Sequence, residues 1–291
     1  MRFSEKIEGM PTVYYISLEE SEDRREYMTQ QMADLGVASV PFIVPRYEEG
    51  MIDITGSYLE AINTAEKGVG TSHLLNMYKW YNETDEEYAI FTEDDIDFST
   101  IEYWNFTWKD FMSRLPKGWE SVQLVRINPF QTMNYEEQDG LKIRKRTWCD
   151  WGCTCLINRE TVGKILKKLV VNEKKMTWNL DWDLHPFPEN LIYYSTPDCV
   201  NKVWSFPLFV ENVLFKTTFM KFYETDGYTH EFDHIHGAKI DQYLSSKYYT
   251  QQWVTHKEKQ LEGIGSMLLT DNPEYTIFTG ISRRDNTVII D

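Results

Sequence analysis

The first part of the chain alternates between apolar and amphipathic segments in an order that few folds allow. Residues 12–18 are an apolar run with aromatic and β-branched side chains, which predicts a buried strand. Met28 and Met32 then recur at helical spacing, and Gly36 is a typical helix end. A second apolar run at residues 40–44 predicts another strand. A strand, a helix and a strand in this order predict a parallel sheet, and therefore an α/β fold.

Further periodic segments continue this pattern toward the middle of the chain. We expect a helix that starts at Ser72 after an irregular, glycine-containing segment at residues 45–70. The remaining expected elements are a helix at 101–115, strands at 122–127, 152–157 and 191–195, a helix at 158–171, and a hairpin around residues 138–140. From about residue 205 the periodicity weakens. We therefore expect one domain over residues 1–205 and a less regular C-terminal extension, residues 206–291, packed on it.

Acidic residues crowd together after a third predicted strand, at residues 88–91. Four carboxylates fall within five positions: Glu93, Asp94, Asp95 and Asp97. Ligands of open α/β sheets bind at the carboxyl ends of strands, and crowded carboxylates repel one another unless a cation is present. Hard divalent cations take such oxygen ligands, often together with substrate phosphates. The run predicts a metal–diphosphate site, and a solvated acidic loop is the alternative.

Composition excludes several classes of partner. The 291-residue chain has a formal net charge of −16, which argues against a protein that binds the phosphate backbone of nucleic acids. It contains no apolar run of about eighteen residues that would predict a membrane span. The first residues lack the apolar region of a signal peptide, so we expect a cytoplasmic protein. The four cysteines fit no zinc spacing, and we expect reduced structural thiols.

Four stretches, in order along the chain, resemble glycosyltransferase family 25, the lipooligosaccharide and collagen galactosyltransferase type. Residues 15–25 (YISLEESEDRR) are similar to the family's opening strand, polar turn and arginine pair. Residues 68–73 (GVGTSH) resemble its Gly-Cys-x-x-Ser-His element, and residues 89–95 (AIFTEDD) resemble its Leu-Glu-Asp-Asp. Residues 152–159 with the following helix, and then Asp181, are similar to a second strand–helix unit and a later aspartate.

The resemblance implies a GT-A type fold, a Rossmann-like mixed sheet flanked by helices. It also implies a UDP-sugar donor and a divalent metal, Mn²⁺ or Mg²⁺. In the acid motif of such enzymes the last carboxylate binds the ion, which here is Asp95, and Glu93 and Asp94 hold the ribose or support the metal. Asp95 and Asp97 also satisfy Asp-x-Asp, so the register could slip by two residues. Alternatively, Asp97 simply caps the loop.

The end of the first predicted strand is where a nucleotide should sit in such a sheet. We expect backbone groups at Ser17 and Leu18 to read the base, and Arg24 to reach a phosphate or stack on the base. The alternative for Arg24 is a surface ion pair with Glu20 or Asp23.

Ser72 and His73 are expected at a helix N-terminus, where the helix dipole favours anions. A phosphate contact is one interpretation. In the other, Ser72 only caps the helix and His73 packs or pairs with a carboxylate.

Asp181 and Asp183 are candidates for the general base that takes the proton of an acceptor hydroxyl. The alternative is a polar loop around a core tryptophan. His236 is a candidate to complete the metal shell, and His230 and His234 lie near it in sequence. A zinc site or ordinary hydrogen-bonded histidines are the alternatives there.

We therefore predict a metal-dependent hexosyltransferase that moves a hexose from a UDP-sugar to a hydroxyl of a glycan or a protein, with inversion at the anomeric carbon. One rival is a metal-dependent nucleotidyl- or phosphotransferase that uses the same acids. Another is a non-catalytic carbohydrate-binding protein, which would bind a glycan through its aromatic residues without a metal. The sequence does not indicate an oligomeric state.

Overall fold

A computed structural model describes the N-terminal two thirds of the chain with gaps. The described residues are 2–52, 54–55, 64–104, 106–125, 143–146, 152–172, 177–179, 188–193, 195, 202–206 and 208–211. The predicted hairpin at 138–140 and the C-terminal extension beyond residue 211 lie outside them.

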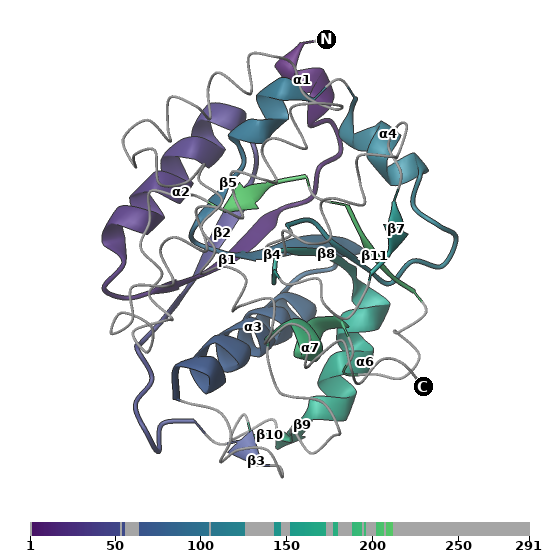
Figure 1. The fold of residues 1–291 in the computed structure, drawn as a ribbon. Coiled ribbons are helices and arrows are strands. Elements are labelled where there is room, and N and C mark those ends of the chain that lie inside the picture. The colour runs from purple at the N-terminus through teal and green to yellow at the C-terminus, as the bar shows by residue number, and fades with distance from the viewer. Residues whose placement is uncertain are drawn as a thin grey trace, which may run out of the picture.

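A mixed sheet forms the centre of the described structure (Figure 1). Within the described residues its order is β2-β1-β4-β8-β6-β11-β7. These strands are β1 (Val13–Leu18), β2 (Ser39–Val44), β4 (Tyr88–Glu93), β6 (Ser121–Gln123), β7 (Arg144–Lys145), β8 (Cys155–Asn158) and β11 (Val203–Ser205). Strand β1 runs parallel to β2 and β4, whereas β8 runs antiparallel to β4 and β6. The predicted α/β class and the mixed sheet are confirmed.

Helices cover both faces of this sheet (Figure 1). They are α1 (Phe3–Lys6), α2 (Glu22–Leu35), α3 (Thr64–Glu83), the 3-10 helix η2 (Ser99–Tyr103), α4 (Trp108–Ser113), α6 (Arg159–Leu169) and α7 (Pro188–Tyr193). Short strands form two small additional sheets: β3 (Ile54–Thr55), β9 (Val170–Asn172) and β10 (Thr177–Asn179) in one, β5 (Ile96–Asp97) and β12 (Val210–Glu211) in the other. None of the helices in the described ranges is long and apolar enough to span a membrane.

Side-chain alternation along the strands creates two hydrophobic cores, one on each face. Val13 and Tyr15 pack into the core beneath α2, η2 and α4, and Tyr14 between them packs into the core beneath α3, α6 and α7. Ile90 and Phe91 of β4 divide in the same way. Because both faces are covered, the central strands read as continuous apolar runs rather than as alternating ones.

Two predicted helices end or begin where the sequence indicates. Helix α2 ends at Gly36, which has φ of 66° and whose N–H caps the helix by donating to carbonyls of the last turn. A residue without a side chain adopts this left-handed conformation at little cost. Helix α6 begins after Asn158, whose side chain accepts a hydrogen bond from the backbone N–H of Thr161 at 2.8 Å.

The predicted start of the third helix is wrong. Helix α3 begins at Thr64, eight positions before Ser72, so part of the segment at 45–70 is helical despite its glycines. Ser72 lies inside the helix, and its hydroxyl donates to the carbonyl of Gly68 at 2.7 Å. Gly68 is tolerated because the ring of Tyr47 occupies the space that a side chain would need. This tertiary contact outweighs the low helix propensity of glycine.

Two other predicted elements also differ. The expected helix at 101–115 is divided into η2 and α4, because Thr107 and Asp110 form a capping box that starts a new helix. The expected strand at 191–195 is instead the end of α7, which is buried at Leu191, Ile192 and Tyr193. A short apolar run does not distinguish a buried strand from a buried helical turn.

Strand direction brings four chain segments to one edge of the sheet. Ile16 of β1 pairs with Glu93 of β4, so the carboxyl ends of these parallel strands meet. Cys155, the first residue of β8, pairs with Phe91 of β4 and with Gln123 of β6. The residues that precede β8 therefore lie beside the acidic residues that follow β4.

Candidate active site

The acidic run turns away from the sheet directly after β4. Glu93 is the last residue of the strand, Asp94 and Asp95 form a turn, and Asp97 belongs to β5. The turn directs consecutive carboxylates to different surroundings, so the four acids do not form a single cluster.

Asp94 points into the protein and is held there by residues of β1 and α2. Its carboxylate accepts a hydrogen bond from the Ser17 hydroxyl at 2.6 Å and one from the Arg24 guanidinium at 2.7 Å. All three residues are buried, with 5% or less of each exposed. Ser17 and Arg24, which were predicted to contact a nucleotide, therefore fix the acidic turn. The predicted alternative of a surface ion pair for Arg24 is wrong.

Burial and charge act in opposite directions on this ion pair. Burial raises the pKa of Asp94 above its ordinary value, although the hydrogen bonds from Ser17 and Arg24 act to lower it. Burial also acts to lower the pKa of Arg24, but the charges of Asp95 and Asp94 outweigh it and the pKa is raised. The guanidinium therefore remains charged and compensates the acids around it.

Asp95 points toward solvent and lines a small pocket. Its side chain is 24% exposed, and one carboxylate oxygen lies 3.2 Å from the Arg24 guanidinium. The pocket has a volume of about 50 Å³ and is lined by Glu93, Asp95, Ile96, Val125, Gly152, Cys153, Thr154 and Glu189. This volume has room for an ion with a few water molecules. The three carboxylates of the lining, from Glu93, Asp95 and Glu189, are oxygen donors of the kind that Mn²⁺ and Mg²⁺ accept, so the lining fits such an ion.

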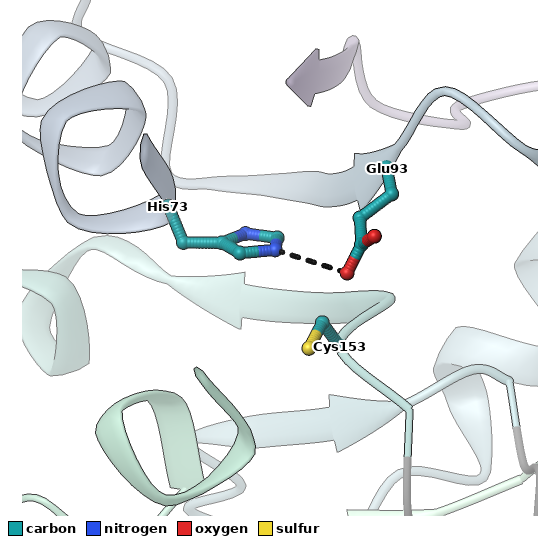
Figure 2. Close-up of side chains that lie close together, drawn as sticks. All are labelled: His73, Glu93 and Cys153. Carbon is teal, nitrogen blue, oxygen red and sulfur yellow. Dashed lines mark ion pairs between the residues drawn. The ribbon is translucent and has the colours of Figure 1, made fainter. Parts of the chain in front are cut away.

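Glu93 also contacts two residues from other elements (Figure 2). His73 of α3 directs its Nε2 toward Glu93, 3.6 Å from the Oε1 atom, and Cys153 lies beside both. One potential ligand atom from each of the three residues lies within 4.8 Å of the others. His73 is fully buried, and neither of its ring nitrogens has a hydrogen-bond partner.

The surroundings perturb both acidic groups of this trio. Burial acts to raise the pKa of Glu93, but His73, with smaller contributions from Arg24 and Cys153, lowers it below its ordinary value. Burial, together with the charges of Glu189 and Glu93, raises the pKa of the Cys153 thiol well above its ordinary value. Cys153 is thus a protonated thiol beside an ionised carboxylate.

Asp97 is nearly fully buried, and its carboxylate accepts a hydrogen bond from the backbone N–H of Ser99 at 2.8 Å. This contact fits the predicted alternative, in which Asp97 caps the loop. Asp97 is also absent from the lining of the pocket.

The backbone at the end of β1 is already used within the protein. The carbonyl of Leu18 accepts from the backbone N–H of Ser21 at 3.0 Å and from the guanidinium of Arg25. Arg25 also donates to the carbonyl of Glu19 at 2.8 Å. The Leu18 carbonyl is therefore less suited to reading a base than the sequence alone indicates.

Ser72 and His73 do not lie at a helix N-terminus, so the predicted phosphate contact loses its physical basis. Ser72 bonds within the helix, as described above. His73 instead faces Glu93, in line with the alternative that it pairs with a carboxylate. The predicted general bases Asp181 and Asp183 and the predicted metal ligand His236 lie outside the described residues, as do His230 and His234.

Several residues of the site carry no signal in the sequence. Gly152 and Cys153 lie just before β8. In the sequence, Cys153 and Cys155 look like ordinary small apolar residues of a strand. The two cysteines are buried free thiols, as expected. Glu189 comes from α7 and accepts a hydrogen bond from the backbone N–H of Gly152 at 3.2 Å. The antiparallel pairing of β8 with β4 brings Gly152 and Cys153 to the acids, and α7 brings Glu189 to Gly152.

Comparisons with known proteins give limited similarity. No family model matches the sequence, and no curated protein matches it, so membership of glycosyltransferase family 25 remains a prediction. A197 from STIV has a TM-score of 0.36 and 8% identity, over 69% of this chain and 84% of that chain. A glycosyltransferase involved in the glycosylation of the major capsid of PBCV-1 has a TM-score of 0.37 and 9% identity, over 68% of this chain and 81% of that chain. Scores this low assign no function.

Proposed function

We propose that this chain is a metal-dependent glycosyltransferase that moves a hexose from a nucleotide-diphosphate sugar, with UDP as the nucleotide, to a hydroxyl of a glycan or a protein. One observation carries the proposal. The carboxylates of Asp95 and Glu93 line the same pocket, which lies at the carboxyl end of β4 and beside the segment that precedes β8. This is the edge of an α/β sheet where ligands bind.

The geometry supports a division of roles among the acids. Asp95 is the partly exposed carboxylate and is assigned to the metal, with Glu93 beside it. When bound, a divalent cation offsets the negative charge that develops on a leaving diphosphate. Asp94 is assigned a positioning role, because Ser17 and Arg24 already use its oxygens. This replaces the ribose contact that the resemblance implies for Asp94.

Arg24 supplies positive charge beside this acidic turn. Its guanidinium lies within ion-pair distance of both Asp94 and Asp95 and holds the turn in one geometry. A fixed turn keeps the Asp95 carboxylate directed toward the pocket, so that little reorganisation is needed when an ion binds. Activation of the acceptor by Asp181 or Asp183, inversion at the anomeric carbon, and a contribution of His236 to the metal are parts of the same proposal.

The proposal is tested by thermal unfolding with Mn²⁺ and a panel of ligands: UDP, GDP, CMP, ADP, UDP-sugars and nucleoside triphosphates. A ligand that binds only the folded state raises the unfolding midpoint. We expect a rise with UDP or a UDP-sugar that requires Mn²⁺ and that is lost in Asp95→Asn. Release of UDP in the presence of the sugar donor then measures turnover.

Two further variants sharpen this test. Asp34→Asn changes an exposed carboxylate of α2 and should keep the full response to UDP and Mn²⁺. Asp97→Asn tests whether the register slips by two residues; we expect it to keep the response, since an amide oxygen can still accept from Ser99. A loss in Asp97→Asn but not in Asp95→Asn would move the metal site. No response to any nucleotide would overturn the proposal, and a response to triphosphates alone would favour the nucleotidyltransferase.

A further inference from the structure

We propose that His73, Glu93 and Cys153 form a second metal site, which takes a transition cation of the Zn²⁺ type rather than a hard cation. The site shares Glu93 and the pocket with the proposed donor site, but His73 and Cys153 have no role in the proposed function, so the inference can be tested without a nucleotide. Its donors are an imidazole nitrogen, a carboxylate oxygen and the Cys153 sulfur, whose thiol would release its proton to solvent as the cation binds. Nitrogen and sulfur ligands of this kind select zinc-like ions over Mg²⁺ and Mn²⁺.

The first observation is the state of the histidine. The His73 side chain has no exposed surface, and both ring nitrogens lack a hydrogen-bond partner. An unsatisfied buried polar group is costly and rare in folded proteins, so such groups call for a specific explanation. A bound cation would satisfy the nitrogen that faces Glu93. Figure 2 shows this nitrogen directed at the carboxylate, with the Cys153 sulfur beside them.

The second observation is the spacing of the donor atoms. The three ligand atoms lie within 4.8 Å of one another, and Nε2 of His73 lies 3.6 Å from Oε1 of Glu93. Ligands at about 2.0–2.3 Å in a tetrahedral zinc site lie roughly 3.3–3.8 Å apart. The histidine–carboxylate distance already falls in this range. The Glu93 carboxylate also interacts with the Cys153 thiol, so the third donor atom lies close to the other two.

The three donors come from separate parts of the chain. His73 lies within α3, Glu93 ends β4, and Cys153 precedes β8, so the fold rather than local sequence brings them together. Glu93 and Cys153 also line the pocket of about 50 Å³ described above. The pocket leaves room for a water molecule or a substrate oxygen as a fourth ligand. Three protein ligands and one open position are typical of catalytic zinc sites.

A simple ion pair between protonated His73 and Glu93 is the competing explanation. It would account for the 3.6 Å contact, and the Cys153 thiol would then donate a hydrogen bond to the Glu93 carboxylate. The two explanations differ in one measurable property, because only the metal site joins the Cys153 sulfur to a cation.

The test uses Co²⁺ as a spectroscopic probe on chelator-treated full-length protein, without nucleotide and without oxygen. Thiolate bound to Co²⁺ gives a charge-transfer band in the near ultraviolet, and a tetrahedral site gives intense visible bands. We expect both bands to saturate at one equivalent and to disappear when Zn²⁺ is added. Cys153→Ser should abolish the charge-transfer band, and His73→Asn should weaken Co²⁺ binding by at least about 10–100-fold.

Matched variants keep the result interpretable. Cys155→Ser changes a buried thiol two residues away, outside the trio, and should keep the band. Asp95→Asn should also keep the band while it loses the response to UDP and Mn²⁺, which separates this site from the proposed donor site. Circular dichroism of each variant confirms folding before titration.

Three outcomes would overturn the inference. They are the absence of a charge-transfer band in the wild-type protein, a band that persists in Cys153→Ser, and a band that Asp95→Asn abolishes. In the first case the ion pair with Glu93 is the explanation for the buried His73 side chain. In the second another cysteine holds the metal, and in the third the cation lies at Asp95.

Discussion

Adjacent acidic residues in this protein have opposite surroundings. Asp94 is buried against Ser17 and Arg24, while Glu93 and Asp95 line the pocket on either side of it. The chain turns directly after Glu93, the last residue of β4, and this turn directs Asp94 inward and Asp95 toward the pocket. The run therefore supplies an ion-binding pair and a buried anchor from three consecutive residues.

Removal of the Arg24 guanidinium should destabilise the protein strongly. Arg24→Met leaves Asp94 as a buried carboxylate without its cation, since both side chains are at most 7% exposed. Breaking a buried ion pair by removing one partner costs about 3–5 kcal/mol. Urea unfolding measures the change in the free energy of unfolding.

The exposed pair between Arg46 and Glu20 provides the control for this substitution. Their side chains are 45% and 49% exposed, at a similar distance of 2.6 Å. Arg46→Met should change the free energy of unfolding by at most about 1 kcal/mol. Equal changes in the free energy of unfolding for the two substitutions would show that burial does not increase the contribution of the Arg24–Asp94 pair to stability.

The segment before β8 determines where this strand begins. Gly152 has φ of 126°, and a Cβ atom there would lie 2.7 Å from the carbonyl oxygen of Val125. Its own carbonyl accepts from the Tyr193 hydroxyl at 3.1 Å, and its N–H donates to Glu189. A glycine at this position lets two backbone segments approach closely, which places Cys153 at the pocket.

Gly152→Ala should be more damaging than an alanine at an open glycine. The new methyl group combines an unfavourable φ with a clash against backbone, and such strain costs about 1–3 kcal/mol before the clash is added. We expect a lower unfolding midpoint and a loss of the Co²⁺ band, because the segment that carries Cys153 must move.

Gly118→Ala is the comparison for the conformational cost alone. Gly118 has φ of 77°, and nothing lies within 4 Å of the position its Cβ would take. Gly118→Ala should lower the free energy of unfolding by about 1–2 kcal/mol, the cost of a left-handed conformation for a residue with a side chain. A similar loss in the two variants would mean that the contact with Val125 contributes little.

Excess negative charge affects the molecule as a whole. The chain carries 46 acidic and 30 basic side chains, for a net charge of −16. A net charge far from zero destabilises the compact state through self-repulsion. Salt screens this repulsion between exposed charges much more than it weakens the buried Arg24 pair.

Moderate salt should therefore stabilise the protein at neutral pH. Between about 10 mM and about 150 mM NaCl the Debye length falls from about 30 Å to about 8 Å. A gain on the order of 1 kcal/mol would raise the unfolding midpoint by about 2–4 °C in a protein of this size. Thermal unfolding at several NaCl concentrations measures the effect.

The control repeats this series at the isoelectric point expected from the sequence, which is about pH 4.9. Net repulsion is small there, so the rise should disappear. The same rise at both pH values would point to binding of a specific ion instead of general screening.

Local patterns determined most of the secondary structure. The apolar runs predicted β1, β2, β4 and β8, and Asn158 and Gly36 marked helix boundaries correctly, because caps depend on residues only a few positions apart. The start of α3 and the helical state of α7 were wrong because tertiary contacts decide them. Tyr47 packs on Gly68, and both faces of α7 are buried.

For the candidate active site too, local sequence predicts one part and tertiary contacts decide the other. The sequence by itself determined that acids follow β4 at a sheet edge, since the order of a buried strand and a polar turn is local. Only the tertiary structure decided that Asp94 turns inward to Arg24, seventy residues away, and that His73 and Cys153 meet Glu93. Those contacts depend on strand order and on the antiparallel direction of β8, which sequence periodicity does not encode.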